Sequence, residues 1–155
     1  MQFTLQHINR LNFAYQHILV VEDDSQHQAE FTDYLRRTIA PRQGNIDFSV
    51  VSTCIGAAGF IQALKDAEFE GKPYIRCIIL DHDMGYGNAT NLIGWMRENN
   101  IMIPIITASG IPHNNDNMLK LGTSPNKYNA LQMHHFQKQE VIDGKATEII
   151  KGYLD

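Results

Sequence analysis

Residues 18–24 read Ile-Leu-Val-Val-Glu-Asp-Asp, and residues 78–83 read Ile-Ile-Leu-Asp-His-Asp. Each stretch is a short run of branched apolar residues that ends in acidic side chains. A run that is this short and this rich in β-branched residues is typical of a strand covered on both faces of a sheet. The two stretches therefore predict two buried strands whose carboxyl ends carry carboxylates.

Other segments extend this pattern along the whole chain. Residues 103–106 form a third apolar run, and residues 48–51 and 133–137 are two weaker strand candidates. Between the strands, apolar residues recur at helical spacing, in segments within 25–40, 60–67, 92–96 and 141–154. This alternation predicts an α/β fold, a doubly wound five-stranded parallel sheet with helices on both faces. Residues 109–133 are rich in proline, glycine and asparagine, and we expect irregular chain there around one short helix.

Length and composition limit what this fold can be used for. The chain has 155 residues, of which 43% are hydrophobic, and a formal net charge of −4. This is enough for one domain, which we expect over residues 17–155 after an N-terminal extension over residues 1–16. The sequence lacks a membrane-spanning apolar run and a signal-like start, so we expect a cytoplasmic protein that binds no membrane. The acidic balance and the absence of a basic run argue against direct nucleic-acid binding. Cys54 and Cys77 are expected to be reduced and buried.

Carboxylates gather where such a sheet places its ligands. Doubly wound sheets bind ligands at the carboxyl ends of their strands, and neighbouring strands lie about 4.8 Å apart. Asp23 and Asp81 are therefore expected within reach of one small cation. Carboxylates this close repel each other unless a cation neutralises them, and oxygen ligands select Mg²⁺ or Mn²⁺. The alternative is that these acids only solvate loops and cap helices, which is the usual role of an aspartate after a strand.

A hydroxyl and an ammonium group are predicted at the same sheet edge. The run at 103–106 continues into Thr107-Ala108-Ser109, and the candidate strand at 133–137 is followed by Lys138. A carboxylate beside a metal ion, a hydroxyl and an ammonium can accept a phosphoryl group, because the cations neutralise the developing charge and the hydroxyl binds a phosphate oxygen. Taken alone, Ser109 is more often a capping hydroxyl and Lys138 a surface charge.

In this order, residues 18–24, 79–81 and 104–109 with Lys138 resemble the signatures of the response-regulator receiver domains of two-component signalling. The resemblance covers residues 17–154 and implies the flavodoxin-like receiver fold. It implies that Asp81 is the phosphoacceptor. It also implies that Glu22, Asp23 and Asp81 serve Mg²⁺ (or Mn²⁺), with the backbone carbonyl of Asp83 as a further metal ligand.

The resemblance assigns three more roles. Ser109 takes the place of the family's hydroxyl residue, Lys138 that of its site lysine, and His135 that of its switch residue. The separation between Ser109 and Lys138 is longer than the family usually shows, so the output surface is expected to be rebuilt. Lys120 and Lys127 lie in the same stretch and compete with Lys138 for the lysine role.

The implied function is that of a single-domain response regulator, which catalyses only its own phosphoryl transfer and dephosphorylation and is not otherwise an enzyme. A histidine kinase or histidine phosphotransfer protein would supply the phosphoryl group. Output would pass to an unidentified downstream protein, and a phosphorylation-linked homodimer is compatible with the resemblance.

Three other functions compete with this interpretation. The chain can be a receiver-like docking module that is never phosphorylated. Asp81-His82-Asp83 also resembles the nucleophile motif of haloacid-dehalogenase-like phosphatases, in which Asp81 would attack and Asp83 would be acid and base. That family carries its motif on the first strand, whereas about half of this chain precedes Asp81. Residues 80–85 resemble an atypical receiver branch proposed to act on cyclic phosphates, but Glu22-Asp23 has the ordinary receiver form.

Overall fold

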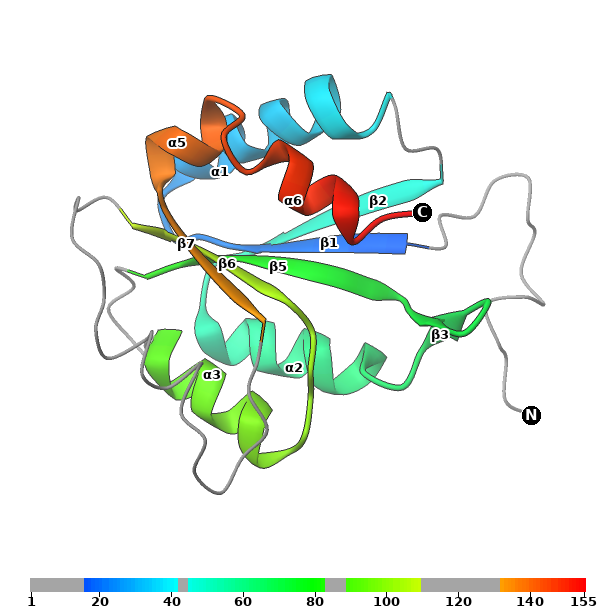
Figure 1. The fold of residues 1–155 in the computed structure, drawn as a ribbon. Coiled ribbons are helices and arrows are strands. Elements are labelled where there is room, and N and C mark those ends of the chain that lie inside the picture. Colours follow the sequence, from blue (N-terminus) through cyan, green and yellow to red (C-terminus); the bar gives the residue numbers. More distant parts are fainter. Residues whose placement is uncertain (1–15, 42–44, 83–88, 110–131) are drawn as a thin grey trace.

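The computed structural model describes residues 16–41, 45–82, 89–109 and 132–155. Within these residues the main sheet has five parallel strands in the order β2-β1-β5-β6-β7 (Figure 1). The strands are β1 (Gln16–Val21), β2 (Ile46–Val51), β5 (Ile75–Asp81), β6 (Ile105–Ser109) and β7 (Met133–Gln137). The predicted doubly wound five-stranded sheet is confirmed.

Helices cover both faces of this sheet. Figure 1 shows α1, α5 and α6 on one face and α2 and α3 on the other. The helices are α1 (Ser25–Tyr34), α2 (Cys54–Leu64), α3 (Ala89–Glu98), α5 (Lys138–Ile142) and α6 (Thr147–Gly152). Because each strand runs parallel to its neighbours, the carboxyl ends of all five lie at one edge of the sheet.

The two central strands are the most deeply buried. Every residue of β1 and β5 is buried, as expected for apolar runs covered on both faces. Side chains alternate between the faces. Leu19 and Ile78 pack with α2 and α3, whereas Ile18 and Ile79 pack with α1, α5 and α6. This rigid core fixes the positions of Glu22 and Asp81, which lie at the carboxyl ends of β1 and β5.

Hydrogen-bonded caps start two helices at the same edge of the sheet. The Asp24 carboxylate accepts a hydrogen bond from the His27 backbone N–H at 2.9 Å, which begins α1. The Thr53 hydroxyl accepts one from the Gly56 N–H at 2.9 Å, which begins α2. Helix α1 then continues into a π-helix over Leu35–Ile39, whose first and last residues are both buried.

Three details differ from the sequence-based expectation. The strand predicted at residues 103–106 begins at Ile105, and the predicted closing helix is split into α5 and α6 around Gly144, whose φ is +90°. Residues 68–73, which lie outside every predicted strand and helix, form a small hairpin of β3 (Glu68–Phe69) and β4 (Lys72–Pro73). Its two turn residues both have positive φ, as a tight hairpin turn requires. Residues 1–15 and 110–131 lie outside the described residues.

Asp155 lies at the opposite edge of the sheet, where β1 and β5 begin. Its carboxylate accepts two hydrogen bonds from the buried Arg76 guanidinium, at 3.0 and 3.1 Å, and its backbone N–H donates to the Gln16 side chain at 3.0 Å. Hydrogen bonds from Arg76 and from Lys72 lower the pKa of Asp155 to about 2. This contact ties the last residue to the starts of β1 and β5.

Two other predictions bear on these described residues. Cys54 and Cys77 are both buried and neither forms a disulfide bond, as expected. Among the helices of the described segments, none combines the length and the apolar character that crossing a membrane requires.

Candidate functional site

The candidate site lies at the carboxyl edge of the sheet, where Glu22 follows β1 directly. Its side chain is fully buried. Its backbone N–H donates to the Val51 carbonyl at 3.0 Å, and its own carbonyl accepts a hydrogen bond from the Gln28 side chain at 2.6 Å. The Asp24 backbone N–H donates to Glu22 Oε2 at 3.2 Å. These hydrogen bonds hold the backbone of Glu22 and its Oε2 atom in place.

Three carboxylates meet at this point. One oxygen each from Glu22, Asp23 and Asp81 lies within 4.8 Å of the others. Glu22 and Asp81 are buried, whereas Asp23 is exposed. Hard oxygen donors at this spacing suit a small divalent cation such as Mg²⁺ or Mn²⁺, and close carboxylates need such a charge to offset their repulsion. The predicted convergence of Asp23 and Asp81 is thus observed, while the predicted ligand Asp83 lies outside the described residues.

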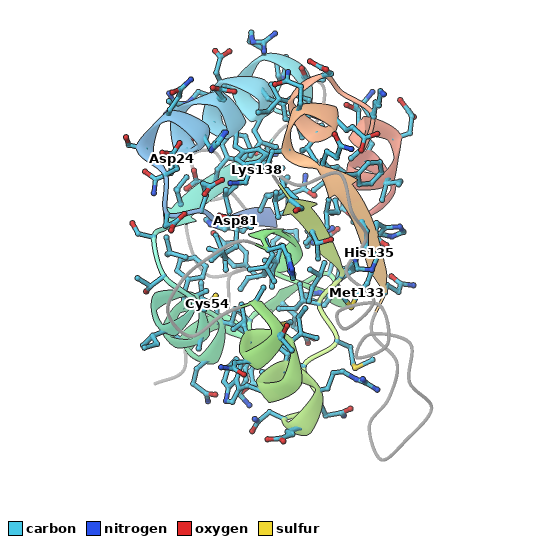
Figure 2. All side chains as sticks on the ribbon, turned by 90° about the vertical axis from the view of Figure 1, so that its left-hand side faces the viewer. Asp24, Cys54, Asp81, Met133, His135 and Lys138 are labelled. Carbon is cyan, nitrogen blue, oxygen red and sulfur yellow. The ribbon has the colours of Figure 1, made fainter. Side chains whose placement is uncertain are left out.

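Lys138 brings a positive charge to two of these carboxylates, those of Glu22 and Asp81; Figure 2 shows Lys138 near Asp81. As the first residue of α5, directly after β7, it places its Nζ atom 3.0 Å from Glu22 Oε1 and 3.4 Å from Asp81 Oδ2. Burial lowers the pKa of Lys138, but the hydrogen bond to Glu22 and the charge of Asp81 outweigh burial, so the pKa is raised overall. Lys120 and Lys127, which the sequence left as alternatives, are outside the described residues.

The protonation of Glu22 follows from this crowding. Burial and then the hydrogen bond with Asp81 raise the pKa of Glu22 to about 8, against the opposing effect of Lys138. Near neutral pH, Glu22 therefore keeps its proton in the folded protein when no metal ion is present. A divalent cation that binds here must displace that proton.

Ser109 comes from β6, which pairs with the strand of Asp81, and His135 comes from β7, one strand further out. Asp81 pairs with Ala108, so Ser109 lies one residue further toward the site edge, and it is buried. His135 pairs with Thr107 and is hydrogen-bonded to it, with 2.7 Å between His135 Nδ1 and Thr107 Oγ1. The neighbouring His134 ring is hydrogen-bonded instead to the Tyr153 hydroxyl at 2.7 Å. The side chains of the two histidines of β7 therefore point to opposite faces of the sheet, as the alternation of side chains along a strand predicts.

Two contacts near the cluster were not predicted from the sequence. His27 Nδ1 lies 3.0 Å from Asp24 Oδ2 and 3.8 Å from Glu22 Oε1, in the first turn of α1. Its position three residues after a capping aspartate was a usable signal for this contact. Thr107 gave no such signal, because its hydrogen bond to His135 depends on the register between β6 and β7.

Comparisons with known proteins agree on the fold. No protein-family model and no curated protein sequence matches the chain. Among solved structures, the receiver domain of the histidine kinase CKI1 from Arabidopsis thaliana, in complex with Mg²⁺ and BeF₃⁻, matches with a TM-score of 0.65 at 14% identity, over 88% of this chain and 90% of that one.

Two bacterial proteins match similarly. The Vibrio cholerae chemotaxis protein CheY4 gives a TM-score of 0.59 at 13% identity, over 88% of this chain and 99% of its own. The receiver domain of the Francisella response regulator 1452 gives 0.56 at 21% identity, over 88% and 98%. The chain therefore has the flavodoxin-like fold of response-regulator receiver domains, with an acidic cluster that resembles their phosphoacceptor site.

Proposed function

We propose that this receiver-fold chain is a response regulator that accepts a phosphoryl group on Asp81. The observation that carries the proposal is the buried contact among Asp81, Glu22 and Lys138, at the carboxyl edge of the sheet. Burying two acids beside one ammonium is costly for a stable fold, so their presence there favours a chemical role.

The donor set also fits a resident Mg²⁺ or Mn²⁺ ion. Glu22, Asp23 and Asp81 supply carboxylate oxygens within 4.8 Å of one another, and Asp83 is the further ligand that the receiver resemblance suggests. A bound divalent cation would neutralise the negative charge that builds up on the phosphoryl oxygens. The plant receiver domain described above was solved with Mg²⁺ and BeF₃⁻, which supports the same use of this cluster.

The reaction itself is a transfer between two protein side chains. A carboxylate oxygen of Asp81 forms a bond to phosphorus while the phosphorus–nitrogen bond of a donor phosphohistidine breaks, and the imidazole leaves with the electron pair of that bond. Lys138 lies 3.4 Å from Asp81 and stabilises the charge on the transferred group. Ser109, at the end of β6, binds one phosphate oxygen in the product.

The donor is a histidine kinase or a histidine phosphotransfer protein. Phosphorylation shifts an equilibrium between two conformations, in which Ser109 moves toward the phosphate and His135 changes its ring orientation. The signal then passes through protein contacts to a downstream protein, or through a phosphorylation-linked homodimer. This function needs no membrane or nucleic-acid contact and takes place in the cytoplasm.

Intact-mass spectrometry after incubation with acetyl phosphate and Mg²⁺ tests the proposal. The wild type should gain one phosphoryl group, and the gain should disappear with EDTA and in Asp81→Asn. Asp66→Asn is the matched control, because the Asp66 side chain is 91% exposed and remote from the cluster in the chain. This variant should be modified like the wild type.

Each alternative function predicts a different result in the same samples. If the chain is a docking module, the wild type would show no adduct after long incubation, even though circular dichroism shows that the wild type and Asp81→Asn are folded. A haloacid-dehalogenase-like phosphatase would turn over p-nitrophenyl phosphate continuously, whereas a receiver forms a transient adduct and releases little product. Either outcome would replace the phosphoacceptor assignment.

A further inference from the structure

Two buried hydroxyl groups lie in sequence along one face of β6. Thr107 and Ser109 are two residues apart and both are buried, so their side chains leave the same face of the strand. Ile105, two residues earlier, packs in the core with α2 and α3, which identifies this face. Ser109 reaches the site edge, whereas Thr107 lies one step further inside, between Leu80 of β5 and His135 of β7.

The Thr107 hydroxyl has two polar neighbours on β7. Its oxygen lies 2.7 Å from His135 Nδ1 and 3.4 Å from the His134 carbonyl oxygen. A carbonyl oxygen only accepts, so the single hydroxyl hydrogen points to His134, and the hydroxyl oxygen accepts a hydrogen bond from Nδ1–H. This arrangement satisfies both contacts and defines one tautomer of the ring.

The other ring nitrogen supports the same tautomer. His135 Nε2 is buried and has no hydrogen-bond partner among the described residues. With the hydrogen on Nδ1, Nε2 is left as a bare acceptor, whereas the alternative tautomer would bury an unpaired N–H donor. Buried donors without a partner are rarer in proteins than under-used acceptors.

From these contacts we propose that Thr107 is a positioning residue for His135, which it holds against β6 as the Nδ1–H tautomer in the unphosphorylated protein. The effect of this hydrogen bond on switching rests on the proposed function. A change in His135 orientation on phosphorylation of Asp81 must break the 2.7 Å hydrogen bond to Thr107. Thr107 thereby stabilises the resting conformation and sets how easily the phosphorylated one forms.

Long-range ¹H–¹⁵N spectra of the histidine rings in the unliganded protein test the positioning role directly. The wild type should show the pattern of a single Nδ1–H tautomer at His135. Thr107→Val has nearly the same shape but no hydroxyl, and should move both ring nitrogens toward the averaged values of a freely exchanging neutral ring. Thr107→Ser keeps the hydroxyl and should restore the wild-type pattern. Thr147→Val removes a threonine hydroxyl that contacts Tyr34 on the opposite face, and should leave His135 unchanged.

The consequence for switching is measured by titrating BeF₃⁻ in the presence of Mg²⁺. Thr107→Val should bind BeF₃⁻ about fivefold more tightly than the wild type, which is the factor that one net hydrogen bond of about 1 kcal/mol represents. Thr107→Ser should match the wild type.

The two kinds of failure are distinguishable. An unchanged ring pattern in Thr107→Val overturns the positioning role, even if the wild type binds BeF₃⁻ normally. A changed ring pattern with unchanged BeF₃⁻ affinity overturns the link to switching. Absence of BeF₃⁻ binding by the wild type overturns the proposed function, and the switching role with it.

Discussion

Replacing Glu22 with glutamine should remove a large part of the pH dependence of stability in the metal-free protein. Burial and the hydrogen bond with Asp81 raise the pKa of Glu22 from its ordinary value of 4.5 to about 8. Between these two values, the folded protein keeps a proton that the unfolded chain releases. The free energy of unfolding contributed by Glu22 therefore falls as the pH rises through this range.

The slope can be worked out from one proton. A group that binds one more proton in the folded than in the unfolded state changes stability by about 1.4 kcal/mol per pH unit. Glu22 should then cost the wild type about 3 kcal/mol between about pH 5.5 and 7.5. Lys138 does not add to this slope, because its raised pKa places its titration above pH 10.5. His17 and His135 have lowered pKa values and oppose the slope below about pH 6.5, but they do so in both proteins and cancel in the difference.

Urea denaturation in EDTA at about pH 5.5, 6.5 and 7.5, followed by the fluorescence of the single tryptophan, Trp95, measures this difference. Glu148→Gln is the matched control, because the Glu148 side chain is 90% exposed. At about pH 7.5, Mg²⁺ should restore stability to the wild type and do so less in Glu22→Gln, since the ion takes the place of the Glu22 proton. Equal pH slopes in the wild type and Glu22→Gln would refute the raised pKa of Glu22.

Two further variants test other contacts. Lys138→Met keeps the length of the side chain and removes the charge that lies 3.4 Å from Asp81. Phosphorylation by acetyl phosphate, measured as the rate of mass gain, should therefore slow about tenfold or more. An unchanged rate would show that Lys138 does not assist the transfer. Asp155→Asn leaves the buried Arg76 without its anion and should cost about 1 kcal/mol near neutral pH, measured by urea denaturation. Because the pKa of Asp155 is lowered to about 2, the advantage of the wild type should be complete above about pH 4 and should diminish as the pH falls through 2; an undiminished advantage at pH 2 would contradict this reasoning.

The strands that carry the site could be predicted because their signals are local. Residues 18–21 and 75–80 are short runs of mostly branched apolar residues, and each is followed by an acidic residue. The predicted alternation of strands and helices indicated that the carboxyl ends of these strands would lie at the same edge of the sheet. The convergence of Asp23 and Asp81 followed from the parallel sheet alone. The sequence could not supply the degree of burial, so the raised pKa of Glu22 followed only from the structure.

Features that depend on strand register, on very short elements or on the path of the chain after α6 could not be predicted from the sequence. The closing helix was expected to be continuous because its apolar residues keep helical spacing on both sides of Gly144. The hairpin at residues 68–73 has strands of two residues each, too short for any periodicity to appear. The bond between Thr107 and His135 depends on strand register, and that between Arg76 and Asp155 on where the chain comes to lie after α6.

The contact between Asp155 and Gln16 means that the first and the last of the described residues meet at one point, away from the acidic cluster. The described unit could therefore be inserted into a single surface loop of a host protein without distortion of either. For the same reason, a circular permutant that joins residues 16 and 155 through a short linker should fold, with new termini placed in the exposed β3–β4 turn.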